Sequence, residues 1–205
     1  MVLITHCGGN TDKINEILVA AQRRFGMYGF EKTSVSEIAA DLHMSKASIY
    51  YYFADKGKLF GAVIEKEHSE FIESVEQECE TLIDASDMLR AYVNINIEFF
   101  RKLLNLSRVK HSDIMENRYA QEQMVELRQK ELVIIEKTLT KGNEQGTFNV
   151  ENSFEMAHLF LDLLKGLRKM TIGRKDVFYL NDEEYNDLVK RVRDFTEIFI
   201  KGISI

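Results

Sequence analysis

Apolar residues recur at helical spacing along most of the chain, and the shortest clear example lies near its start. Positions i, i+3, i+4 and i+7 of this segment form one apolar stripe made by Val35, Ile38, Ala39 and Leu42. Ser34 precedes the stripe and Glu37 follows three residues after Ser34, which is the pattern of a capping box. The sequence therefore predicts a short helix that begins just after Ser34.

A second short helix is expected almost at once. The apolar pattern breaks at His43 and Met44, and Ser45 then offers an N-cap to a segment that runs to about Phe53. Two helices joined by a turn of three or four residues form a helix-turn-helix, whose second helix enters the major groove of DNA. The pattern therefore predicts this motif between Ser34 and Phe53.

The outward side of the second helix carries no carboxylate. At about 100° per residue, Ile49 faces inward, with Tyr52 and Phe53 close beside it. The opposite side and its shoulders are formed by Ala47, Ser48, Tyr50 and Tyr51. Lys46 lies at the start of the helix. Since this side carries no carboxylate, a polyanion can lie against it without meeting an acid.

Helical periodicity continues through the rest of the chain, and no proline interrupts it. Further helices are expected at about residues 11–28, 58–80, 85–106, 108–116, 118–142, 153–172 and 182–201. Residues 1–10 are expected to form a flexible leader, and Gly29 to end the first helix in a left-handed conformation. We predict an all-α protein of about nine helices, with an N-terminal three-helix head (residues 1–57) and a C-terminal helical-bundle body (residues 58–205).

The last two predicted helices carry more apolar surface than one core requires. The helix at 153–172 is apolar on two sides, with Phe154 on one stripe and Phe160 on the other, and the helix at 182–201 repeats apolar residues at bundle spacing. A helix buried on both sides needs a second partner besides its own core. We therefore predict a homodimer through a four-helix interface built by these two helices from each copy. The alternative is a larger core within one monomer.

Charge is distributed unevenly along the chain. The whole sequence has 27 basic and 33 acidic residues, a net charge of −6, whereas residues 1–60 hold seven basic and six acidic residues. An acidic body with a locally basic end suits sequence-selective DNA binding, because self-repulsion discourages non-specific contact with nucleic acid.

Cysteine usage and hydropathy indicate the compartment. Cys7 and Cys79 are far apart and lie in no metal-ligand spacing, so a disulfide scaffold is not expected and a reducing cytoplasm is the simplest interpretation. No apolar run approaches the roughly 20 residues that a membrane span needs. We expect a soluble, cytoplasmic protein without a membrane partner.

The run EIAADLHMSKASIYYYFADKGKL, residues 37–59, resembles the DNA-binding segment of the tetracycline-repressor (TetR) family of bacterial regulators. That family's pattern is roughly Asp/Glu-Ile-Ala, then Gly-Val-Ser-Lys-Gly-Thr-Leu-Tyr-x-Tyr-Phe, then Lys-Glu-x-Leu. The chain departs from it at His43, Ala47 and Gly57, where the family usually has Gly, Gly and an acid. The resemblance implies a transcriptional regulator, expected to be a repressor, that binds a pseudo-palindromic DNA operator as a homodimer and responds to a small-molecule effector.

The resemblance also implies which residues contact DNA. Phosphate contacts are expected from Ser34, Ser45, Lys46, Tyr50 and Lys56. Major-groove contacts are expected from Ala47, Ser48 and Tyr51. No Arg, Asn or Gln lies on the recognition helix to make a bidentate base contact, so specificity is expected to depend on thymine methyl groups, single hydrogen bonds and DNA shape.

The body is rich in Phe, Met and Leu, which suits a pocket for an apolar or amphipathic effector. The candidate lining residues are Tyr92, Phe99, Phe100, Leu103, His111, Met115, Tyr119 and Met124. The alternative for each of these residues is an ordinary position in a filled core.

Two hypotheses from other classes of protein remain open. Glu65-x-x-His68 and Glu155-x-x-His158, with Glu98 nearby in an apolar stretch, have the spacing of a metal-carboxylate helical bundle. By rotation, however, Glu65 and Glu155 fall away from the apolar stripes of their helices, and we expect no metal or cofactor. The second alternative is a helical adaptor, which would show no operator preference. The chain has no Gly-rich phosphate loop, HExxH or GxSxG motif, so we do not expect an enzyme.

Overall fold

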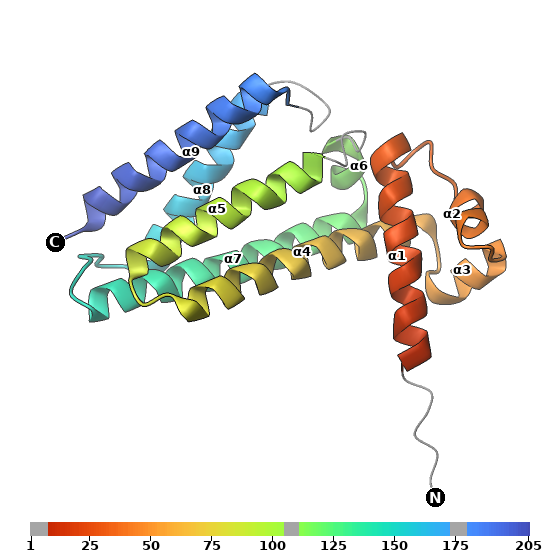
Figure 1. The fold of residues 1–205 in the computed structure, drawn as a ribbon, viewed down its shortest axis with the longest axis horizontal. Helices are drawn as coiled ribbons and strands as arrows, with labels where there is room; N and C mark the ends of the chain where they lie inside the picture. The colour runs from red at the N-terminus through yellow and green to blue at the C-terminus, as the bar shows by residue number, and fades with distance from the viewer. Residues whose placement is uncertain (1–7, 105–110, 173–179) are drawn as a thin grey trace, which may run out of the picture. The chain divides into compact units, whose positions relative to one another are not determined.

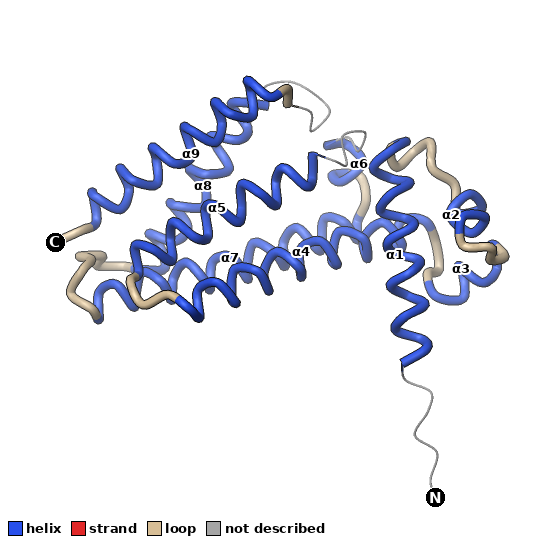
Figure 2. The backbone as a smooth tube through the Cα atoms, viewed as in Figure 1, coloured by secondary structure: helices blue, strands red, loops and turns tan. Residues whose placement is uncertain are grey.

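The computed structural model describes residues 8–104, 111–172 and 180–205. Within these residues the secondary structure is helical, apart from one isolated bridge between Phe148 and Ser204 (Figures 1 and 2). The helices are α1 (Gly8–Tyr28), α2 (Val35–Asp41), α3 (Lys46–Tyr52), α4 (Lys56–Thr81), α5 (Ala85–Leu104), α6 (His111–Met115), α7 (Arg118–Glu144), α8 (Ser153–Ile172) and α9 (Asp182–Ile203). The predicted all-α fold with an N-terminal helix-turn-helix is confirmed.

Two compact units make up the described chain. The first comprises residues 8–67 together with 111–123, and the second comprises 68–104, 124–172 and 180–205. Helices α4 and α7 therefore each contribute to both units, which differs from a division of the chain after residue 57. That division remains a prediction about domains.

The first unit is held by an aromatic cluster at the end of α1. The ring of Phe25 lies 5.8 Å from that of Phe30 and 5.2 Å from that of Phe60 on α4, measured between centroids. Phe30 folds back in this way because Gly29 adopts the left-handed conformation, with φ 82°, and its N–H donates to the Phe25 carbonyl at 2.8 Å. The predicted role of Gly29 as the residue that ends α1 is confirmed.

Two helix starts differ from the sequence prediction. Helix α1 begins at Gly8, so residues 8–10 are helical and are not part of a flexible leader. Gly8, Gly9 and Asn10 are poor helix formers without an apolar side chain, and the pattern therefore carried no signal there. Helix α4 begins at Lys56 because the carboxylate of Asp55 accepts the N–H of Lys58 at 2.7 Å and so caps the helix.

In the second unit α8 packs against α9 through aromatic residues. The ring of Phe160 lies 4.7 Å from that of Phe199 and 6.4 Å from that of Tyr92 on α5. The assignment of stripes on α8 is corrected in detail: Phe160 is fully buried, whereas Phe154 is exposed. A second apolar stripe nevertheless remains on the outside of α8, formed by Leu159, Leu163 and Met170.

Candidate nucleic-acid interface

Helix α2 is held at its start by the predicted capping box. The N–H of Glu37 donates to the Ser34 hydroxyl at 3.3 Å, and the N–H of Ser34 donates to the Glu37 carboxylate at 2.8 Å. The inward side of the helix is formed by Val35, Ile38 and Ala39, all of which are buried. A helix of seven residues has little stability of its own, so these caps and this packing define where it begins and which way it faces.

The turn between α2 and α3 depends on a left-handed residue. His43 has φ 52°, and the N–H of Met44 donates to the carbonyl of Ala39 at 2.8 Å. Glycine suits this conformation best, but histidine enters it more readily than most side chains. The departure of His43 from the family pattern is therefore accommodated without a change in the turn.

Helix α3 presents its predicted outward side to solvent. Ser45 caps the helix by accepting the N–H of Ser48 at 3.0 Å, and Ile49 is its one buried residue. Tyr51 is 82 % exposed and Tyr50 is 40 % exposed, while Lys46 and Ala47 are also exposed. Ser48 is half-buried, and its hydroxyl lies 2.7 Å from that of Ser45. The structure thus brings Ser45, Lys46, Ala47, Ser48, Tyr50 and Tyr51 together on one short helix and its cap.

The acids of α2 are matched by a cation from α1. Arg24 donates from Nε and Nη2 to the two carboxylate oxygens of Asp41, both at 2.6 Å, and its Nη1 lies 3.5 Å from Glu37. The hydrogen bond from Arg24 lowers the pKa of Asp41, and the bonds from Ser34 lower that of Glu37. Because Arg24 neutralises much of this negative charge, the surface around α2 opposes a phosphate backbone less than the sequence alone indicates.

Lys56 is placed differently from the other predicted phosphate contacts. Its ammonium donates to the carbonyl oxygens of Phe30 at 2.8 Å, Thr33 at 3.2 Å and Glu31 at 3.4 Å, and it lies 4.3 Å from the centroid of the Phe30 ring. An ammonium has three donors, so all of them meet carbonyl oxygens here. Lys56 thus ties the segment after α1 to the start of α4, and the phosphate contact expected from the sequence would require its ammonium to leave these carbonyls.

The candidate effector residues that the structure describes belong to both units, and their role in an effector pocket stays a prediction. Tyr92 and Phe99 are buried in the core of the second unit, where Tyr92 donates to Glu131 and Phe99 stacks on Phe71. Met115 and Tyr119 belong to the first unit, whereas Met124 belongs to the second. The side chains of Leu103 and His111 lie outside the described part of the structure.

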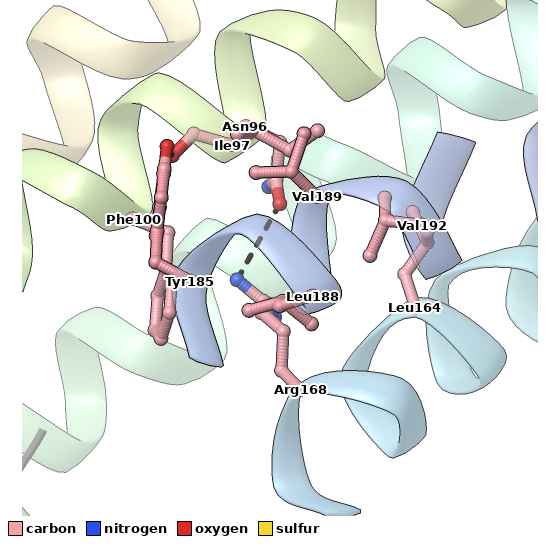
Figure 3. A pocket seen from close by; sticks show the side chains of 9 residues that line it. All are labelled: Asn96, Ile97, Phe100, Leu164, Arg168, Tyr185, Leu188, Val189 and Val192. Atoms are coloured by element: carbon pink, nitrogen blue, oxygen red, sulfur yellow. Dashed lines mark hydrogen bonds between the residues drawn. The ribbon is translucent and has the colours of Figure 1, made fainter. Parts of the chain in front are cut away.

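Phe100 lines a cavity whose other walls are not among the candidate lining residues. The cavity has a volume of about 10 Å³ and lies between α5, α8 and α9 (Figure 3). Its walls are Asn96, Ile97, Phe100, Leu164, Arg168, Tyr185, Leu188, Val189 and Val192. One signal pointed to it: Arg168 follows the buried Leu164 by one helical turn, which places a cation on the core side of α8.

A chain of polar groups lies within the second unit. The hydroxyl of Tyr92 donates to the buried carboxylate of Glu131 at 2.6 Å, and the ammonium of Lys165 is 4.0 Å from the same carboxylate. Arg128 pairs with Asp162 at 2.7 Å. Burial raises the pKa of Tyr92, so the phenol keeps its proton and acts as the donor.

The metal-carboxylate alternative is not favoured. Within residues 8–104, 111–172 and 180–205, no group of three or more His, Cys, Asp or Glu side chains is arranged to hold a metal ion. Glu65, Glu98 and Glu155 are exposed, His68 is buried beside Phe99, and His158 packs on Phe154. Among the described helices, none is long and apolar enough to cross a membrane.

An exposed recognition helix on a capped helix-turn-helix defines a DNA-binding transcriptional regulator. Comparison with known families agrees. Residues 17–63 match the model of the bacterial regulatory proteins of the tetR family, and residues 67–205 match that of the QacR-like C-terminal region. The chain belongs to the TetR family, and its C-terminal region is of the ligand-binding kind.

Individual relatives extend over almost the whole chain. A transcriptional regulator from Cytophaga hutchinsonii has a solved structure with a TM-score of 0.85 and 35 % identity, covering 94 % of this chain and 99 % of that one. The transcriptional regulator QacR of Staphylococcus aureus is 21 % identical to this chain. The aligned region covers 93 % of this chain and 97 % of QacR. The structure of FadR of Bacillus subtilis in complex with stearoyl-CoA has a TM-score of 0.66 and 20 % identity. The match covers 92 % of this chain and 98 % of that one.

Proposed function

We propose that this regulator is a repressor that binds a pseudo-palindromic operator as a homodimer and leaves it when a small molecule binds the second unit. The observation that carries the proposal is the outward side of α3, which is exposed and free of carboxylates, while its inward side is locked by Ile49. We further propose that the protein acts in the cytoplasm, where operator DNA is accessible.

The DNA contacts divide into two kinds in this proposal. Lys46, Tyr50 and the capping residues Ser34 and Ser45 contact phosphates and set the position of the head on the duplex. Ala47, Ser48 and Tyr51 meet base edges in the major groove. None of these three forms a bidentate contact, so the methyl of Ala47 and the exposed ring of Tyr51 suit thymine methyl groups, and shape supplies the remaining specificity.

The homodimer interface in this proposal is the outer side of α8 together with α9. Leu159, Leu163 and Met170 share one side of α8 by their spacing and are exposed, as is Ile198 on α9. Exposed apolar stripes on neighbouring helices are typical of a subunit interface. A two-fold pairing there gives the two recognition helices a fixed spacing, which a palindromic operator requires.

Transmission of the effector signal in this proposal uses α4 and α7, which both continue from the first unit into the second. Within the first unit they meet at a close contact. A Cβ atom added to Gly61 would lie 2.6 Å from the Cβ of Tyr119. Asn117 bridges the two helices, because its Oδ1 accepts the N–H of Ala120 at 3.0 Å while its Nδ2 donates to the carbonyl of Gly57 at 3.4 Å. A shift of α7 is thereby passed to the start of α4, next to the head.

Selection of bound fragments from a random DNA pool tests the proposal. At moderate ionic strength we expect an inverted repeat whose half-sites lie about one helical turn, or a multiple of it, apart. A Tyr51→Ala variant folds as the wild type does and loses part of the selected preference. A helical adaptor would show no preference for any sequence over bulk DNA, and that result would exclude the regulator.

Sedimentation of the purified protein tests the homodimer. A double variant Leu159→Glu, Leu163→Glu is expected to sediment as a monomer and to bind a single half-site only. Val125→Glu on α7 is the matched control, because Val125 is also an exposed apolar residue but lies on another helix. If Val125→Glu dissociates the dimer as much as the double variant does, the proposed interface on α8 is contradicted.

A further inference from the structure

Arg168 lies at the wall of the cavity and has no anionic partner among the residues that the structure describes. Its guanidinium is 5.5 Å from the centroid of the Phe100 ring, and its Nη1 donates to the neutral Asn96 at 3.4 Å (Figure 3). No carboxylate of the described residues forms an ion pair with it. A partly buried cation held only by an aromatic face and a long hydrogen bond has unused capacity to bind an anion.

The neighbouring charges increase this excess of positive charge. Arg128 and Lys165 lie near Arg168, because Arg128 and Arg168 both act on the ionisation of Tyr92 and on that of Lys165. Burial lowers the pKa of Lys165, which shows that its charge is disfavoured in this environment. The Nη1 of Arg128 is buried without a hydrogen-bond partner in the described structure.

The acids nearest to Arg128 and Lys165 already have partners. The carboxylate of Glu131 accepts the Tyr92 hydroxyl at 2.6 Å and has the Lys165 ammonium at 4.0 Å. Asp162 is exposed and pairs with Arg128. Glu98 acts on the cavity-lining Tyr185, but so do Arg101 and Arg193, so cations outnumber acids around the cavity. Among the described residues, no carboxylate pairs with Arg168, the cation on the cavity wall. This balance favours an anionic ligand over a cationic one.

The rest of the cavity is apolar. Ile97, Phe100, Leu164, Leu188 and Val192 supply most of its walls, and its polar groups come from Arg168, Asn96 and Tyr185. Such a site suits a molecule with an apolar tail and a single charged head. At about 10 Å³ the cavity has room for no more than about one water molecule, so a larger ligand must separate α5, α8 and α9.

We propose that the effector is an anionic amphiphile whose carboxylate or phosphate head binds Arg168 and whose tail parts α5 from α8 and α9. This inference rests on the proposed effector control and names the ligand class for it. Because the ligand enters only a widened arrangement of these helices, it binds one arrangement better than the other, which is what an effector must do to shift an equilibrium.

Calorimetric titration of the full chain with four probes that share a decyl chain tests this proposal. The probes are decanoate, decanoyl-CoA, decyltrimethylammonium and decanol, each below its micelle-forming concentration. We expect an anionic probe to bind at least about tenfold more tightly than the cation and the alcohol. Decanoate and decanoyl-CoA distinguish a carboxylate head from a phosphate-bearing one, and tight binding of either supports the proposal. Tighter binding of the cation overturns it.

Variants then locate the head group. Arg168→Gln is expected to weaken binding of the anionic probe by about tenfold or more. Arg168→Lys keeps the charge without the planar guanidinium and is expected to weaken this binding by less. Arg191→Gln is the matched control, because Arg191 lies on α9 and pairs within its own helix with Asp187. Circular dichroism checks each fold; if the Gln variant does not fold, the Lys variant alone must still weaken binding. Unchanged affinity in a folded Arg168 variant overturns the proposal.

Operator binding by the wild type separates this inference from the function on which it rests. A protein that selects an operator but binds none of the anionic probes contradicts only the ligand class. If the protein binds decanoate through Arg168 but prefers no DNA sequence, the proposed regulator function is contradicted and the proposed ligand site still holds. Release of the selected operator by decanoate or decanoyl-CoA, absent with decanol, is the result expected when both proposals hold.

Discussion

The two short helices of the head and the three long helices around the cavity are built by opposite means. In the head, the interactions that define α2 and α3 join residues only three positions apart, Ser34 with Glu37 and Ser45 with Ser48. In the body they join residues far apart, such as Tyr92 with Glu131 over 39 positions and Arg90 with Glu197 over 107. The residues proposed to act in the head are exposed apart from the half-buried Ser48, whereas those in the body are mostly buried.

This difference teaches how each region can change. The short helices of the head are capped by their own side chains and α3 is anchored by Ile49, so we expect the head to keep one conformation while its outward side stays exposed. The body holds charges in a partly apolar interior, where small separations between helices alter the energy of each charge. A rigid head and a responsive body are what a ligand-controlled regulator needs, and the following experiments test that contrast.

The largest effect is expected at the residue that anchors α3. Ile49 is 0 % exposed, so Ile49→Ala leaves a cavity under a helix of seven residues and should lower the free energy of unfolding by about 2–5 kcal/mol. Tyr51→Ala, on the opposite side of the same helix, should stay within about 0.5 kcal/mol while weakening operator binding. Denaturant melts and DNA titrations compare the two variants. Similar loss of stability in both would mean that α3 does not divide into an anchoring and a contacting side.

A somewhat smaller effect is expected inside the body. Tyr92→Phe removes the donor to a buried carboxylate and should destabilise the fold by about 1.5–3 kcal/mol. Tyr185→Phe is the matched control, because Tyr185 is also buried but its hydroxyl is 3.5 Å from the Ile97 carbonyl, at the limit of a hydrogen bond. Thermal melts should separate the two variants. An equal effect would show that the polar groups of the body are no more costly to disturb than ordinary core residues.

The same contrast explains what the sequence could predict. The capping box, the left-handed Gly29 and the outward side of α3 depend on residues within four positions of each other, and each was predictable. The start of α1 at Gly8 was missed because Gly-Gly-Asn has no helical preference. The cavity was missed because its walls come from three separate helices, and helical periodicity shows that Phe99 and Tyr92 face inward without showing whether they meet a space or another side chain.

A third experiment concerns the contact through which the body would act on the head. A Cβ at Gly61 would lie 2.6 Å from the Cβ of Tyr119 and 3.2 Å from its carbonyl carbon, so Gly61→Ala must move α4 from α7. Overpacking costs about 1–3 kcal/mol, and the higher helix propensity of alanine returns up to about 1 kcal/mol. Gly202→Ala in α9 is the control, because nothing lies within 4 Å of its added Cβ.

The readout that distinguishes coupling from stability is the response to effector. Gly61→Ala should alter how far an effector lowers operator affinity, while Gly202→Ala should leave that ratio unchanged. Operator titrations with and without decanoate give the ratio for each variant. If Gly61→Ala lowers the melting temperature and leaves the ratio intact, the contact between α4 and α7 supports the fold only, and the signal passes elsewhere.

The smallest effect is expected for two lysines, Lys46 and Lys56, from which the sequence predicts the same kind of phosphate contact. Lys46 is exposed at the start of α3, with its ammonium 5.6 Å from the centroid of the Tyr50 ring, whereas the ammonium of Lys56 is bound by three backbone carbonyls. A phosphate contact contributes close to one unit to the slope of log K against log salt. Lys46→Ala should therefore flatten that slope by about one, and Lys56→Ala should leave it unchanged while lowering the melting temperature of the head. Flattening in both variants would show that Lys56 exchanges its carbonyl partners for phosphate on the operator, in which case the head is less rigid than its caps imply.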